Sequence, residues 1–255
     1  MKWIRIGRGF TLSLVIGIFL LSLFAIWTVA DPVGPTLNYI SHSSGSSATG
    51  SLADNSSHTG GVIAKMNLDV RQQNPHWKAY VGNISGNLVL EDGFNYSIYE
   101  WSLTSLQGEV YATRASSITW GSLTCANISQ LDIEMAAMNH TPSYTLVDNI
   151  SATFDDDANS HAQFYAGSTN IAANSCDFST NLYANDTAQS AGGSTWEEVV
   201  LFQQSNNATV YTSIIDENNY GYANGSFFDY EILLPEKGEP TFTGATPYYF
   251  YVELV

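Results

Sequence analysis

The chain has 255 residues, with 24 acidic and only eight basic side chains, and a formal net charge of −16. All of the acids but only five of the basic residues follow Ala30, so that part carries a net charge of −19. A surface this acidic repels nucleic acid and anionic lipid headgroups, which argues against a nucleic-acid-binding function.

The N-terminal segment predicts a membrane-spanning or signal helix. Residues 1–9 contain three basic side chains and would form a cytoplasmic flank, and residues 10–30 are uncharged and long enough to cross a bilayer. The next basic residue is Lys65. A basic flank followed by a long stretch without Lys or Arg places the N-terminus inside and the remainder outside.

Three fates of this leader stay open. It stays as an anchor, since it is longer than the usual core of a signal peptide. Alternatively, it is cut after Ala30, because Thr28-Val29-Ala30 is a small-residue cleavage pattern. In the third alternative it is cut before Phe10, because Arg8-Gly9-Phe10-Thr11 resembles the class III leader of archaeal type IV pilins. That resemblance implies an apolar helix that packs in a filament core.

The segment 31–60 is rich in Ser, Gly and Thr and has no basic residue, so it predicts an extended stalk. We expect the folded domain to occupy residues 61–255. Its first half shows the alternating patterns of short strands, which we predict at 62–70, 77–84, 86–90, 96–103, 108–114 and 117–120. The residues 91–95 predict the turn of a hairpin.

The apolar period changes to that of a helix at about 127–140. Ile128, Leu131, Met135 and Met138 recur every three or four residues. The run from Ser129 to Asp132 is a cap-like start, and a proline closes the segment.

Strand patterns then resume, at 162–166, 181–184, 196–203, 209–216, 227–234 and 247–254. Gln204–Asn207 predicts a hairpin turn between two of them. The last strand is apolar or aromatic on both faces, which favours a central or covered position. Many short strands with one helix predict a mostly β protein, an antiparallel β-sandwich.

Cys125 and Cys176 are the only cysteines. Outside the cell two cysteines predict one disulfide, which would pin the helix at 127–140 to the loop around Cys176.

Asparagine sequons predict a glycosylated exterior. Nine Asn-X-Ser/Thr motifs occur, about twice the number that composition alone gives. They lie at Asn55, Asn83, Asn95, Asn127, Asn139, Asn149, Asn185, Asn207 and Asn224.

The sequence contains none of the local signatures of common catalytic sites, so we assign no catalytic residue and expect a non-enzymatic protein. His76, His140 and His161 are dispersed and predict turn or surface positions. The run Asp155, Asp156, Asp157 offers oxygen ligands and is a weak candidate for Ca²⁺; no other cofactor is implied.

The polar loop around Tyr220 and Tyr222 is a weak candidate for recognition, because loops on a rigid sandwich often carry binding residues.

Three stretches, 77–86, 108–112 and 248–254, resemble an uncharacterised family of predicted archaeal secreted or cell-surface proteins. The resemblance implies a surface location and a β-rich fold, with no biochemical role. We therefore expect a cell-surface glycoprotein with a structural, envelope-assembly or adhesion role, held at the membrane by residues 10–30 or secreted. Its partners would be other surface proteins, glycans or further copies of itself. The alternatives are a pilin-like filament subunit and a carbohydrate-binding module or glycan-active enzyme.

Overall fold

The computed structural model describes residues 31–43, 57–67, 73–140, 147–154, 160–189, 195–237 and 244–255. The predicted leader, 10–30, and much of the predicted stalk lie outside these residues. Within the described part of the chain, no helix is long and apolar enough to span a bilayer. The residues from Asp31 to Val255 belong to one compact unit.

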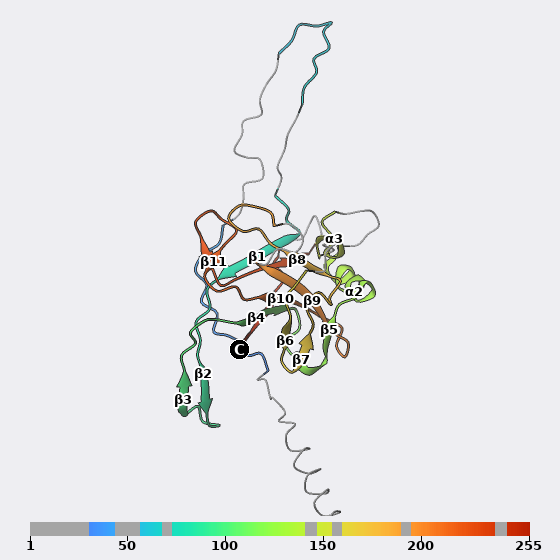
Figure 1. Cartoon of the computed structure of the whole chain (residues 1–255). Helices are drawn as coiled ribbons and strands as arrows, with labels where there is room; N and C mark the ends of the chain where they lie inside the picture. Colours follow the sequence, from blue (N-terminus) through green and yellow to red (C-terminus); the bar gives the residue numbers. More distant parts are fainter. Residues whose placement is uncertain are drawn as a thin grey trace, which may run out of the picture. The chain divides into compact units, whose positions relative to one another are not determined.

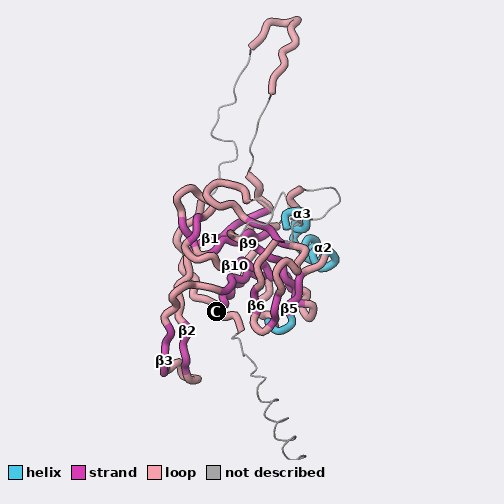
Figure 2. The backbone as a smooth tube through the Cα atoms, in the orientation of Figure 1, coloured by secondary structure: helices cyan, strands magenta, loops and turns pink. Residues whose placement is uncertain are grey.

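The unit is mostly antiparallel β, as the sequence predicts (Figures 1 and 2). The described helices are α2, Ile128–Met138, and α3, Ile150–Phe154, with one turn of 3₁₀ helix at Trp120–Ser122. The described strands are β1 Trp77–Gly82, β2 Leu88–Glu91, β3 Ser97–Trp101, β4 Gly108–Thr113, β5 Leu123–Cys125, β6 Phe164–Ala166, β7 Thr169–Ile171, β8 Ser179–Asn181, β9 Glu197–Gln203, β10 Ala208–Ile214, β11 Asn219–Tyr220, β12 Phe227–Phe228, β13 Tyr230–Pro235 and β14 Tyr249–Leu254.

A six-stranded sheet forms the centre, in the order β14-β4-β10-β9-β5, with β8 also paired to β9. The strands β9 and β10 are the predicted hairpin, with Val200 opposite Tyr211, and the turn at 204–207 is confirmed. Both strands are buried almost throughout. Burial on both faces explains why β9 reads as a continuous apolar run rather than an alternating one.

Different elements cover the two faces of this sheet. On one face, β9 and β10 pack against α2, α3 and β13 through a cluster that includes Leu131, Phe154 and Ile232. On the other face, the sheet packs against Trp120 and the β6–β7 hairpin. The separate β1–β13 pair contributes to the first layer. The structure therefore does not confirm a sandwich of two full sheets, because short hairpins and helices supply much of the cover.

The N-cap of α2 lies two residues before Ser129, where the cap was predicted. Asn127 is the N-cap residue: its side chain accepts a hydrogen bond from the backbone N–H of Gln130 at 3.1 Å. The Gln130 side chain accepts in return from the backbone N–H of Asn127 at 2.9 Å, which completes a capping box. Asn139 ends the helix in a left-handed conformation with φ of 53°.

Replacement of Asn127 by alanine is expected to lower the free energy of unfolding by about 1 kcal/mol, because the N–H of Gln130 loses its acceptor. Urea denaturation of protein from a host that does not glycosylate would measure this loss without interference from the sequon. Ser129→Ala is the control, because Ser129 is exposed and lies two residues after Asn127 in the first turn of the helix. This change should leave the free energy of unfolding nearly unaltered. Equal losses in both variants would contradict the capping role of Asn127.

Two predicted features near the start of the folded unit are corrected. Residues 62–67 form no strand, and the first described strand is β1 at Trp77. Alternation alone does not make a strand when no partner supplies hydrogen bonds. Val33, in the predicted stalk, instead forms an antiparallel bridge with Val252. The last strand, β14, lies at the end of the strand order, next to β4. Phe250 and Tyr251 pack against the two opposite clusters, so the strand is partly covered on both faces, which is the second of the two positions predicted for it.

Candidate interaction surfaces

The hairpin of β2 and β3 carries one wholly apolar face. Its register pairs Leu88 with Trp101 and Leu90 with Tyr99. Side chains two residues apart share a face of a strand, so these four residues lie together. The rings of Tyr99 and Trp101 meet edge to face, with centroids 4.8 Å apart. We call Leu88, Leu90, Tyr99 and Trp101 the apolar face.

The opposite face of the same hairpin is mixed: it carries polar pairs together with exposed Val89, and a shift of register after Leu90 leaves Ile98 exposed without a cross-strand partner. The register pairs Val89 with Glu100 and Glu91 with Ser97. The hydroxyl of Ser97 donates to Glu91 Oε1 at 3.0 Å, and the Asn87 amide donates to Glu100. The polar groups in these bonds are also exposed to water, so they do not need to be buried by another part of the protein. The hairpin therefore has one wholly apolar face and one face that carries most of its polar groups.

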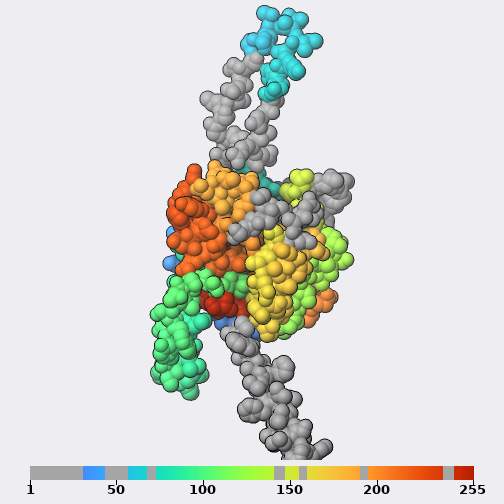
Figure 3. Space-filling view, viewed as in Figure 1, coloured from blue at the N-terminus to red at the C-terminus, as the bar shows by residue number. Residues whose placement is uncertain are grey.

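The apolar face is open to solvent. Every residue of β2 and β3 is exposed, including Tyr99 at 58% and Trp101 at 47%. In Figure 3 the hairpin stands out in green as a separate ridge of side chains. A two-stranded hairpin is only marginally stable by itself in water. Exposed apolar faces of this kind are typical of interaction sites.

Local turn chemistry builds the tip of the hairpin. Asp92 Oδ1 accepts hydrogen bonds from the backbone N–H groups of Phe94, at 2.8 Å, and Tyr96, at 3.0 Å. Asn95 has φ of 65°, a left-handed conformation that asparagine tolerates better than most residues. Phe94 and Tyr96 are both largely exposed, so the tip adds two aromatic rings to the hairpin.

A shallow hollow of about 510 Å³ continues the apolar face at its base. Leu88, Trp101, Leu103 and Val255 supply its apolar walls, and Ser102, Thr104 and Ser105 supply hydroxyl groups. The hollow therefore joins the hairpin to the last residue of the chain.

The predicted recognition loop forms a second exposed aromatic surface. The residues Tyr220 and Phe227 pair across β11 and β12, with ring centroids 4.7 Å apart. Tyr222 stacks on Phe228 with an angle of 6° between their planes. Tyr220, Tyr222 and Phe227 are all exposed. We call these three residues the aromatic loop surface.

Buried polar groups hold this loop in place. Asp229 accepts from the backbone N–H of Asn218 at 2.8 Å and from that of Ile84 at 2.7 Å. The indole of Trp196, which is fully buried, donates to the carbonyl of Tyr220 at 2.7 Å. The aromatic rings are therefore displayed on a fixed backbone, which is the arrangement that favours recognition.

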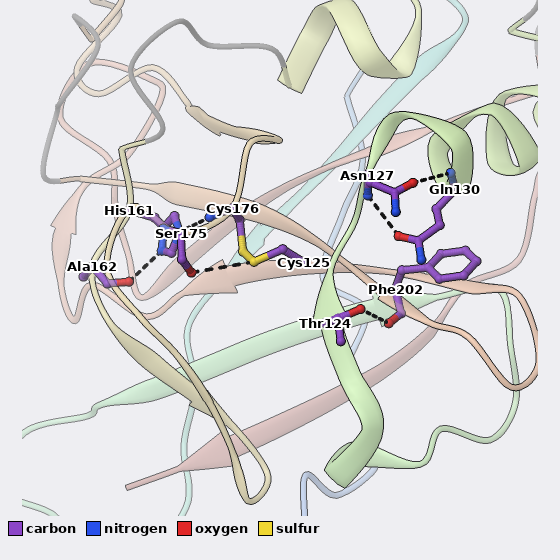
Figure 4. The surroundings of a disulfide bond; sticks show 9 residues. All are labelled: Thr124, Cys125, Asn127, Gln130, His161, Ala162, Ser175, Cys176 and Phe202. Carbon is purple, nitrogen blue, oxygen red and sulfur yellow. Dashed lines mark hydrogen bonds between the residues drawn. A yellow bond between two sulfur atoms is a disulfide. The ribbon is translucent and has the colours of Figure 1, made fainter.

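The disulfide between Cys125 and Cys176 is confirmed (Figure 4). It links β5, just ahead of α2, to the segment that follows β7, as predicted. His161 lies beside it, and its Nε2 accepts from the backbone N–H groups of Ser175 and Cys176, both at 3.1 Å. Its Nδ1 donates to the carbonyl of Ala162 at 2.7 Å.

His161 is thus a buried structural group in the loop before β6, so of the two predicted positions, surface or turn, the surface position is excluded. Two accepted bonds at Nε2 require the neutral ring with its proton on Nδ1. His140 is also buried, and desolvation lowers the pKa of its imidazole.

Two buried carboxyl groups lie side by side on one face of the sheet, and no sequence pattern predicted this pair. Glu109 of β4 lies opposite Glu253 of β14, and each is only 4% exposed. Glu253 accepts from the Tyr111 hydroxyl and from the N–H of Gly167, both at 2.9 Å. Burial and then the nearby negative charge of Glu253 raise the pKa of Glu109 to about 8. Because both groups are enclosed, the pair bears on stability rather than on contact with a ligand.

The sequons lie where a glycan could be attached. Of the eight that fall within described residues, seven asparagines are exposed and Asn149 is half-buried. Four of them, Asn95, Asn139, Asn185 and Asn207, occupy left-handed backbone positions, which also explains asparagine there. Asn55 lies outside the described residues.

The predicted calcium ligands Asp155, Asp156 and Asp157 also lie outside the described residues. Among the residues that the structure does describe, no group of three or more His, Cys, Asp or Glu side chains is placed to hold a metal ion.

No family model, curated protein or solved structure matches this chain.

Proposed function

We propose that this chain is a non-enzymatic cell-surface glycoprotein, membrane-anchored or secreted, with a structural, envelope-assembly or adhesion role. The aromatic loop surface is the observation that carries the proposal. It supplies rings that are exposed to solvent on a backbone held by hydrogen bonds from Trp196 and to Asp229, an arrangement that suits a contact surface.

Two further observations support a location outside the cytosol. The disulfide between Cys125 and Cys176 closes within the folded unit, and such bonds persist in oxidising compartments. The apolar run at 10–30 with its basic flank supplies the means of export or anchoring. The acidic, lysine-poor composition of the exported part suits a solvated exterior.

Intact-mass measurement of the native protein tests the location and processing together. A chain that begins at Met1 and carries glycan mass supports an anchored glycoprotein, and one that begins at Asp31 supports a secreted one. A chain that begins at Phe10 would make the filament subunit the leading function. A bare polypeptide mass would remove glycosylation from the proposal.

Replacement of both Tyr220 and Tyr222 by alanine is expected to weaken surface contact at least about tenfold, because exposed aromatic anchors dominate such interfaces. The probes are cell-envelope fragments from the native source and an array of neutral oligosaccharides, each tested with the full chain. Tyr165→Ala, an exposed tyrosine on β6, is the matched control and should leave binding unchanged.

The probe whose binding the double variant loses distinguishes assembly or adhesion from carbohydrate binding. Loss of binding to oligosaccharides would favour the carbohydrate-binding alternative, since sugars stack on exposed aromatic rings. Loss of binding to envelope protein alone supports assembly or adhesion. Equal binding by the double variant and the parent chain would contradict a contact role for the loop.

A further inference from the structure

The apolar face of the β2–β3 hairpin lies at one particular end of the central sheet. The N–H of Val255 donates to the carbonyl of Gln107 at 3.0 Å, in the segment that joins β3 to β4. Gly86, just before β2, packs against the side chain of Leu254. The base of the hairpin is therefore beside the C-terminal end of β14.

The chain enters the folded unit at the same end. Val33 and Val252 exchange two backbone hydrogen bonds, at 3.0 and 2.8 Å, and run antiparallel. Asp31 therefore lies alongside the end of β14. Consistent with this placement, its carboxylate lies close to Gly167, whose N–H bonds to Glu253.

Ala30, the last residue of the apolar run, is covalently joined to Asp31. The chain therefore enters the folded unit from the leader at the C-terminal end of β14. The base of the hairpin and the hollow beside it lie at the same end of β14.

We propose that the apolar face of the hairpin rests on the outer surface of the same membrane, as a second contact beside the anchor. This inference depends on the proposed function, because it takes residues 10–30 to be a membrane anchor. An amphipathic element of this kind lies in the interface with its apolar side towards the acyl chains and its polar side towards water.

The side chains of the hairpin match a lipid interface in two ways. Phe94, Tyr96, Tyr99 and Trp101 are aromatic, and Tyr and Trp are the residues enriched where headgroups meet hydrocarbon. The hairpin also carries Glu91, Asp92 and Glu100, and the sequence has no Lys or Arg between Lys78 and Arg114. That charge favours a surface of zwitterionic or uncharged headgroups over an anionic one.

The negative charge also disfavours a second copy of this chain as the partner of the apolar face. Two hairpins that each carry Glu91, Asp92 and Glu100 would repel one another when brought together. A lipid surface of neutral headgroups carries no such penalty. The membrane is therefore the occupant that both the position and the charge of the hairpin support.

Labelling of two adjacent positions tests this contact in the full chain. Leu90→Cys places a fluorophore on the apolar face, and Val89→Cys places it on the opposite face one residue away. The native cysteines are paired with each other and do not react with the label. Each labelled chain is reconstituted in phosphatidylcholine vesicles that contain a nitroxide-bearing lipid.

We expect the label at residue 90 to emit at shorter wavelength and to be quenched by the lipid nitroxide at least about twofold more than the label at residue 89. Partial replacement of the lipid by phosphatidylglycerol at low ionic strength should reduce that difference, and added salt should restore it.

Three other results would overturn the inference, and they can be told apart. Equal quenching at both positions, in a chain that floats with the vesicles, would leave the anchor intact and remove the hairpin contact. A blue shift at residue 90 without lipid quenching, dependent on the protein-to-lipid ratio, would assign the face to a second copy. A chain that does not float with the vesicles would refute both the anchor and the contact.

Discussion

Removal of the disulfide is expected to lower the free energy of unfolding by about 4 kcal/mol in the double variant Cys125→Ser, Cys176→Ala. The bond joins residues 51 apart in sequence, so its loss frees a long loop in the unfolded chain. Alanine at 176 avoids placing a hydroxyl in a fully buried position, whereas residue 125 is half-buried beside Ser175.

Urea denaturation with and without a reductant measures this effect. The parent chain should lose a similar amount of stability when reduced, and the double variant should not respond to the reductant. Ser175→Ala is the control, because it removes a neighbour 3.7 Å from the Cys125 sulfur and leaves the disulfide in place. A parent chain whose unfolding midpoint is the same in both conditions would rule out the stabilising role.

The buried pair of carboxyl groups is expected to make the protein less stable as the pH rises. The pKa of Glu109 is raised to about 8 in the folded protein, chiefly by burial and then by Glu253. Between the ordinary carboxyl pKa and that value, the folded state binds the proton and the unfolded state does not. The stabilisation is therefore fully present below the unfolded pKa and is lost as the pH rises through about 8.

Glu109→Gln is expected to flatten this dependence and to be more stable than the parent chain above about pH 8, because the amide cannot ionise. The upper bound on the difference is about 5 kcal/mol, at about 1.4 kcal/mol for each unit of pKa. Burial also raises the pKa of Glu198 and raises that of Glu231 to about 7, so part of the slope should remain.

Unfolding measured in urea between about pH 5 and 9 would follow this loss of stability in both proteins. Glu100→Gln, on the exposed polar face of the hairpin, controls for the removal of one negative charge. Parallel curves for Glu109→Gln and the parent chain would refute the assignment of the proton to this pair.

Several parts of the structure follow from local sequence. The helix α2 falls within the predicted 127–140, because its apolar spacing and capping residues act within a few positions of one another. The β2–β3 and β9–β10 hairpins likewise follow from turn residues between alternating segments. The disulfide follows from the number of cysteines, since a chain with two cysteines allows only one intramolecular pairing.

Other features depend on contacts that no local pattern contains. Residues 62–67 alternate like a strand but have no strand partner, whereas Val33 in a polar segment does. The short helix α3 gives too little periodicity to be predicted and is held by packing against the sheet.

By itself, then, the sequence determined the antiparallel β character of this protein, its one long helix, its disulfide and the apolar run that precedes the folded unit. Only the tertiary structure decided which side chains are covered. Glu109 and Glu253 are 144 positions apart and meet because β4 and β14 pair in one register. Leu90 and Tyr99, which the alternating pattern would place in a core, remain exposed because nothing within the described residues buries their face. Burial is a property of the assembled layers, and a pattern along one strand specifies a face without specifying what covers it.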